Sequence, residues 1–182
     1  MKNKGKIFEE AFRDSIDKER IVLFRLNDQP QSFAKTAKFS LKNPFDYICF
    51  DTKSKTLFCL ELKSTKGKSI SYEDINSENI QNEMIHKHQI LGLMEKGEYD
   101  NVVAGFIFNF RHFEGDKEKY FETTYFQDIN SFLEMTKKIN KKSFNELDLL
   151  TCGNAVKING EKKRTRFRWN FNEFFQNISN KE

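Results

Sequence analysis

The sequence predicts an α/β or α+β protein with a central mixed β-sheet flanked by helices. Short aromatic and apolar runs separated by polar turns predict strands, and segments with apolar residues at helical spacing predict helices that pack on a sheet. The nearly continuous apolar run at 102–110 is typical of a strand covered on both faces. A length of 182 residues predicts a single domain, 1–182, with a substantial hydrophobic core.

The N-terminal part of the chain is expected to hold one helix and one strand before an irregular segment. Residues 6–18 predict an amphipathic helix, and its expected buried stripe comprises Ile7, Phe8, Ala11, Phe12, Ser15 and Ile16. Residues 21–26 are apolar except for Arg25 and predict the first strand. The polar residues that follow, 28–43, predict a loop on the surface.

Two apolar runs, 45–50 and 56–63, predict an antiparallel hairpin, because a short polar segment separates them. A loop of about four residues pairs Asp46 with Glu61. Directly opposed residues point to the same face, and alternation along the strand places Lys63 on that face too. The three side chains are therefore expected to converge. A register slip of one residue would reverse the faces and leave Glu61 and Lys63 as a solvated ion pair.

The same patterns continue to the end of the chain. They predict a helix at 77–96, paired strands at 102–110 and 121–126, a helix at 128–138, a short helix at 144–149 and a basic strand region at 155–169. Gln89 is four residues from both Ile85 and Leu93, so it is expected on the packed side of its helix. His86 and His88 are two residues apart on that helix and are expected to point in different directions.

The hairpin carries a pattern suited to a divalent metal and a phosphodiester. Two opposed carboxylates, Asp46 and Glu61, repel each other on a largely apolar strand face, and a hard cation would remove that penalty. Mg²⁺, with Mn²⁺ as a possible substitute, takes oxygen ligands, and the backbone carbonyl of Leu62 could supply a further one. Lys63 could orient or deprotonate the attacking water, or offset charge on the scissile phosphate.

Five segments in a fixed order make this pattern more specific than Glu-x-Lys alone. They are residues 5–9 (GKIFE), 43–46 (NPFD), 61–65 (ELKST), 88–89 (HQ) and 104–107 (AGFI). Together they resemble the RecU-type Holliday junction resolvases of the PD-(D/E)XK nuclease superfamily, in particular their compact phage-like form. The resemblance spans residues from about Gly5 to Trp169. One departure is that 28–43 is shorter than the projecting stalk of larger family members, so this stalk-like loop leaves the mode of junction selection open.

The resemblance implies a restriction-endonuclease-like core and a Mg²⁺-dependent, structure-selective endodeoxyribonuclease that resolves four-way DNA junctions in recombination and repair. Asp46 and Glu61 would be metal ligands, Lys63 the catalytic lysine, Glu9 the acidic residue of the first helix, and Gln89 a glutamine of the site. The resemblance also implies a homodimer, and a recombinase partner is possible. Without it, Glu9 is a first-turn glutamate favoured by the helix dipole, and Gln89 satisfies backbone groups.

Basic residues are expected to contact the DNA phosphates at three places. They are Lys35, Lys38 and Lys42 in the loop, Lys66 and Lys68 after the hairpin, and Lys162, Lys163, Arg164, Arg166 and Arg168 near the C-terminus. If residues 165–169 are extended, the arginines share one face and the aromatic residues take the other. The net charge of +4 permits nucleic-acid binding without demonstrating it. The alternative is that these charges form a solvated surface.

Composition excludes several other classes. Three cysteines without CxxC or His/Cys spacing argue against a disulfide framework and a zinc site. No apolar stretch reaches the ~18 residues of a membrane span, and the N-terminus does not read as a signal sequence. A cytoplasmic location, in a bacterial cell or a phage-infected host, is therefore expected. Two other functions remain open: a PD-(D/E)XK nuclease that acts on duplex, flap or single-stranded DNA, and a non-catalytic DNA-binding module of recombination.

Overall fold

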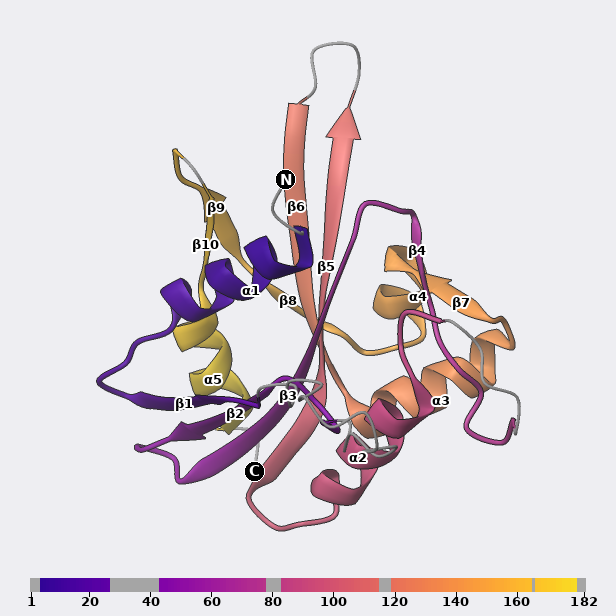
Figure 1. Cartoon of the computed structure of the whole chain (residues 1–182), viewed down its shortest axis with the longest axis horizontal. Helices are drawn as coiled ribbons and strands as arrows, with labels where there is room; N and C mark the ends of the chain where they lie inside the picture. The colour runs from indigo at the N-terminus through magenta and orange to yellow at the C-terminus, as the bar shows by residue number, and fades with distance from the viewer. Residues whose placement is uncertain (1–3, 27–42, 78–82, 115–118, 165, 180–182) are drawn as a thin grey trace, which may run out of the picture.

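The computed structural model describes residues 4–26, 43–77, 83–114, 119–164 and 166–179. A six-stranded mixed sheet with the strand order β1-β2-β3-β5-β6-β8 forms its centre (Figure 1). These strands are β1 (Ile21–Arg25), β2 (Tyr47–Asp51), β3 (Thr56–Thr65), β5 (Val102–Glu114), β6 (Lys119–Asp128) and β8 (Val156–Ile158). Strands β3 and β5 are parallel, whereas the other neighbours are antiparallel. The expected mixed sheet is thus confirmed.

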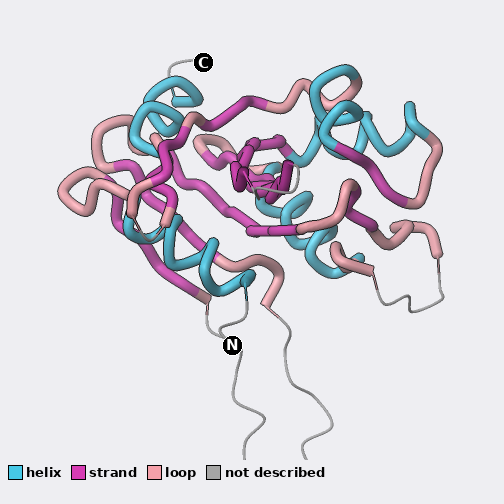
Figure 2. The backbone as a smooth tube through the Cα atoms, turned by 90° about the horizontal axis from the view of Figure 1, so that it is seen from above, coloured by secondary structure: helices cyan, strands magenta, loops and turns pink. Residues whose placement is uncertain are grey.

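Helices cover both faces of this sheet (Figures 1 and 2). The helices are α1 (Lys4–Ser15), α2 (Lys87–Gly97), α3 (Ile129–Ile139), α4 (Glu146–Thr151) and α5 (Phe171–Ser179). One apolar cluster joins α1 and α5 to the sheet, and a second joins α2, α3 and α4 to its other face. Phe106 and Ile107, adjacent on β5, are both fully buried and belong to different clusters. The run at 102–110 is therefore covered on both faces, as predicted.

The β2–β3 hairpin has the predicted register. Phe50 pairs with Leu57 and Ile48 pairs with Cys59. The turn closes with Lys55 in a left-handed conformation, at φ 61°. Because the side chains alternate on both strands, this register decides which of them face α2.

Two smaller sheets extend this core. Strand β4 (Ser69–Ser71) pairs with β7 (Ser143–Asn145), and β9 (Gly160–Lys162) pairs with β10 (Phe167–Trp169). The short helix expected at 144–149 therefore begins later, at Glu146, since Phe144 lies buried in β7. Phe167 and Trp169 are buried and Arg168 is exposed, which confirms the predicted alternation within β10, whereas Arg164 and Arg166 precede the strand.

Two expectations about helices were wrong in detail. Helix α1 ends at Ser15, and Ile7 lies outside its buried stripe, with 40% of its surface exposed. The helix expected at 77–96 begins at Lys87, because Ile85 forms a β-bridge with Tyr72. Helix α5 was not predicted, although its residues at 171, 174, 175 and 178 are apolar and follow helical spacing.

No helix in the described part of the chain combines the length and apolarity needed to cross a membrane.

Candidate active site

Asp46 lies at the entrance to β2, beside β3. Its backbone carbonyl accepts a hydrogen bond from the Leu26 amide at 2.8 Å, and its Oδ2 accepts one from the Leu62 amide at 2.9 Å. The paired register of the hairpin ends at Tyr47 and Leu60, and the Asp46 amide donates to the Leu60 carbonyl at 3.1 Å, so Asp46 lies next to the end of the register and not in a regular pair with Glu61. The two carboxylates nevertheless line one cavity, and the charge of Asp46 raises the pKa of Glu61.

Glu61 is the most constrained residue of the site. It is 2% exposed, its Oε1 lies 2.9 Å from Lys63 Nζ, and the same oxygen accepts a hydrogen bond from Gln89 Nε2 at 2.5 Å. Its other oxygen, Oε2, is buried and has no hydrogen-bond partner among the described residues. Burial raises the pKa of Glu61 to about 8, although the ammonium of Lys63 lowers it and the carboxylate of Asp46 raises it further. A buried acceptor without a partner is costly, so this oxygen calls for a cation or a proton.

Gln89 connects Glu61 to the start of α2. Its Nε2 donates to Glu61, and its Oε1 accepts from the backbone amide of His86 at 3.0 Å. The helix can come this close because Gly92 has no side chain: a Cβ there would lie 2.3 Å from Pro44 Cβ. Pro44 immediately precedes the Phe45-Asp46 pair, so this close approach sets α2 against the carboxylates. The prediction that Gln89 faces the packed side is confirmed.

Glu9 reaches the same site from α1. Its Oε2 lies 2.7 Å from Arg25 Nη2 of β1, and its side chain is 22% exposed. Burial raises the pKa of Glu9, Arg25 lowers it and Asp46 raises it, which places the two carboxylates within electrostatic reach of each other. The residues come together around an open cavity of about 460 Å³, lined by Glu9, Asn43, Phe45, Asp46, Glu61, Leu62, Lys63, His86, His88 and Gln89. Four elements distant in sequence thus supply one pocket.

The oxygen donors of this pocket fit a hard divalent cation that takes only a few of its ligands from the protein. Within the described residues no group of three or more His, Cys, Asp or Glu side chains is arranged to hold a metal. Mg²⁺, however, commonly uses only one or two carboxylates and completes its shell with water and substrate phosphate oxygens. Asp46, Glu61 and the backbone carbonyl of Leu62 are the residues that could hold it. The unpartnered Glu61 Oε2 is the observation that favours such an ion.

The predicted DNA-binding residues divide into three groups. Lys35, Lys38 and Lys42 lie outside the described residues, as does nearly all of the stalk-like loop at 28–43. Lys66 and Lys68 are exposed in the turn between β3 and β4. The C-terminal group, comprising Lys162, Lys163, Arg164, Arg166 and Arg168, is also exposed, on and between β9 and β10.

Acidic residues accompany this C-terminal group, and sequence reasoning did not place one of them, Asp14, there. Arg166 forms an ion pair with Asp14 of α1, and Arg168 Nη1 donates to the Asp14 carbonyl at 3.1 Å. Lys163 pairs with Glu161 on its own hairpin. The surface is therefore mixed in charge, because two carboxylates neutralise part of it.

Sequence reasoning also missed the two histidines of the pocket. The expectation that His86 and His88 point apart on one helix was wrong, because α2 begins at Lys87 and His86 is its N-cap. The two rings are stacked, with centroids 5.5 Å apart. Both line the cavity with the carboxylates.

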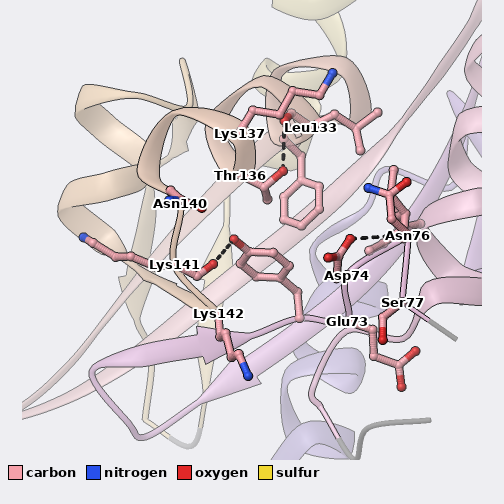
Figure 3. Close-up of a pocket in the computed structure, with 14 residues that line it drawn as sticks. Glu73, Asp74, Asn76, Ser77, Leu133, Thr136, Lys137, Asn140, Lys141 and Lys142 are labelled. Carbon is pink, nitrogen blue, oxygen red and sulfur yellow. Dashed lines mark hydrogen bonds between the residues drawn. The ribbon is translucent and has the colours of Figure 1, made fainter. Parts of the chain in front are cut away.

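A second cavity, of about 590 Å³, lies between α3 and residues 72–77 (Figure 3). Its charged groups are mixed: Glu73 and Asp74 lie on one side, and Lys137 and Lys141 extend away from it. The acidic and basic groups of this cavity do not converge on one point, in contrast to those around Glu61.

Comparison with known proteins gives one informative relative. No family model matches the chain. The SPbeta prophage-derived uncharacterized protein YotM of Bacillus subtilis strain 168 is 29% identical over 193 residues, covering 99% of this chain and 89% of that protein. The similarity therefore runs along nearly the whole chain.

Proposed function

We propose that this protein is a Mg²⁺-dependent, structure-selective endodeoxyribonuclease that cuts four-way DNA junctions, with a restriction-endonuclease-like core of the PD-(D/E)XK type. The observation that carries the proposal is the environment of Glu61. Its buried Oε2 has no hydrogen-bond partner in the described part of the chain, Asp46 lines the same cavity, and Lys63 contacts the other oxygen of Glu61. An apolar core would not retain such a group for stability alone, because it costs free energy in the absence of a ligand.

Each side chain has a distinct task in this hydrolysis. Mg²⁺, when bound, would polarise the scissile phosphate and the attacking water. Asp46 and Glu61 would hold the ion together with the Leu62 carbonyl, and Lys63 would offset the negative charge that develops on the phosphate. Gln89 fixes the rotamer of Glu61, and Glu9 adds negative charge at the rim of the pocket. The product would carry a 5′ phosphate.

The substrate and assembly complete the proposal. Exposed cations on the β3–β4 turn and on β9–β10 would contact the phosphates of the junction arms. Two opposed strands must be cut, so we propose a two-fold symmetric homodimer. Its place of action would be the cytoplasm of a bacterial cell or a phage-infected host, with a recombinase as a possible partner. The prophage origin of the relative in Bacillus subtilis supports this setting.

Cleavage of a mobile four-way junction, with and without Mg²⁺, tests the proposal. We expect paired nicks near the branch point only when Mg²⁺ or Mn²⁺ is present. Lys63→Ala should lose roughly 10²-fold or more in rate, because it removes charge stabilisation from the transition state. A linear duplex of the same sequence should remain uncut, whereas equal cutting of the duplex would point to a different nuclease of the superfamily. No nicks under any metal condition would refute the enzyme and leave a DNA-binding module.

A further inference from the structure

A carboxylate–imidazole pair stands at the border of the candidate active site, and the mechanism above does not use it. Glu73 Oε1 lies 3.1 Å from Nδ1 of His86, and Glu73 Oε2 accepts the backbone amide of Lys87 at 2.5 Å. Partial burial raises the pKa of Glu73, but these bonds from Lys87 and His86 outweigh it and lower the pKa overall. Glu73 is therefore an ionised anchor with both oxygens engaged.

This anchor fixes the orientation of the His86 ring. His86 is the N-cap of α2, and its backbone amide is already tied to Gln89. Its ring is stacked on His88, and its side chain is 35% exposed. With Nδ1 directed at Glu73, the other ring nitrogen, Nε2, is the one left to face a substrate in the cavity. Two contacts, with Glu73 and with His88, thus orient the ring within the pocket that contains Glu61.

We propose that His86 is the general acid of phosphodiester cleavage, with Glu73 as its positioning residue; this inference rests on the nuclease function proposed above. As the attacking water forms its bond to phosphorus, the bond from phosphorus to the 3′ oxygen breaks, and its electron pair stays on that oxygen. The Nε2 proton of the imidazolium moves to the oxygen and yields a 3′ hydroxyl. The imidazole is left neutral and regains a proton from solvent, which also receives the proton lost by the water.

The chemistry favours His86 over the other proton carriers of the pocket. In-line displacement places the attacking and leaving oxygens on opposite sides of phosphorus, so the acid must differ from the group that assists the water. Lys63 is engaged with Glu61 on β3, whereas His86 comes from a separate element, and its ring contacts Glu73 and His88. The charged and titratable groups around the ring are Glu73, Lys87 and His88, with Glu9, Asp46, Glu61 and Lys63 in the same cavity.

A substrate with a sulfur in place of the scissile 3′ oxygen tests the proposal directly. A thiolate leaves without protonation, so a missing general acid harms the oxygen substrate only. His86→Asn retains a good N-cap residue and should lower the rate constant on the oxygen junction by about 10²-fold or more. On the sulfur junction, cut at the same mapped position, it should match wild type. Equal loss on both substrates would overturn the proposal and leave His86 with a structural or phosphate-binding role.

Two further variants sharpen this test. Glu73→Gln should lose less than His86→Asn on the oxygen junction and nothing on the sulfur junction, because it perturbs only the orientation and charge of the ring. His112→Asn is the matched control, since His112 also pairs with a glutamate, Glu146, at 3.2 Å but lies outside the pocket. It should cut both junctions at the wild-type rate.

The two proposals fail in different ways. Wild-type protein that cuts no junction with Mg²⁺ or Mn²⁺ would refute the nuclease itself. If the wild-type protein cuts and the His86→Asn variant cuts the oxygen junction equally fast, only the general-acid role of His86 is refuted. Added imidazole should restore cleavage of the oxygen junction by a His86→Gly variant. If imidazole does not restore it and the variant also cuts the sulfur junction more slowly than wild type, the general-acid role of His86 is refuted.

Discussion

Two buried carboxylates on the same hairpin have opposite environments. Asp51, at the far end of β2, is fully buried and is held by Arg20, whose Nε lies 2.9 Å from Asp51 Oδ1 and whose Nη2 contacts the other oxygen. The amide of Lys53 adds a third bond. Burial alone would raise the pKa of Asp51, but these partners lower it to about 2. Glu61 is equally buried, and its pKa is raised to about 8.

The difference distinguishes a structural acid from one that is kept for a ligand. Asp51 has its charge matched within the fold, so its ionised form contributes to stability. Glu61 has one lysine and one amide on Oε1, while Oε2 has no partner among the described residues. Of these two buried carboxylates, only Glu61 is therefore in an environment that disfavours its ionised form. Three predictions test this contrast, and a fourth, with the smallest expected effect, concerns the surface ion pair of Arg166 with Asp14.

Removing either carboxylate of the pocket should abolish catalysis while binding survives. Asp46→Asn and Glu61→Gln keep the shape of the side chains but remove the charge that would hold the metal, so junction cleavage should fall by at least about 10³-fold. Gel-shift affinity for the junction in Ca²⁺ or EDTA should stay close to wild type. Wild-type cleavage by either variant would show that the contrast with Asp51 has no catalytic meaning.

Breaking the structural pair should cost stability and leave the chemistry intact. Asp51→Asn leaves the buried Arg20 without its counter-charge and should lower the free energy of unfolding at pH 7 by roughly 3 kcal/mol. The ionised pair stabilises the fold above the ordinary pKa of 3.8, and this contribution is lost as pH falls toward about 2. Denaturant unfolding at pH 7 and pH 2.5 measures it. A difference that does not shrink at the lower pH would contradict the assignment.

Glu61→Gln should have the opposite effect on stability. Between its ordinary pKa of 4.5 and about 8, the folded protein keeps a proton that the unfolded chain has released, so stability falls as pH rises through this window. At pH 8 without metal the variant should therefore be more stable than wild type, by roughly 1–3 kcal/mol. At pH 5 the difference should nearly vanish. Thermal melts with and without Mg²⁺ add a control, because Mg²⁺ should raise the melting temperature of wild type and not of the variant.

The sequence predicted the part of this site that lies on neighbouring strands. A short turn and strict alternation fix the register of a hairpin, so Asp46, Glu61 and Lys63 could be placed on one face from local information. Helical spacing from Leu93 likewise predicted a buried Gln89, whereas Ile85, the other residue used for that prediction, lies before the helix. Both predictions depend only on residues that are close along the chain or that face each other across one turn.

The rest of the site depends on contacts between distant segments. Helix α2 starts late because Ile85 pairs with Tyr72, and this pairing brings Glu73 to His86. No periodicity in the sequence signals that bridge. Arg166 and Asp14 are 152 positions apart, so their ion pair could not be seen from the basic run either. In contrast, α5 carried a visible helical pattern at residues 171–178 that sequence reasoning did not use.

That ion pair gives the smallest of the predicted effects. Asp14→Asn frees Arg166 for a phosphate and should tighten junction binding by roughly two- to fivefold, as for one exposed ion pair. The slope of log affinity against log salt should steepen by about one unit if a new phosphate contact forms. Glu134→Gln is the matched control, because it removes an exposed acid paired with Lys138 on α3, far along the chain from β10. Equal tightening by both variants would mean that net charge alone acts, and that the β9–β10 surface is no DNA contact.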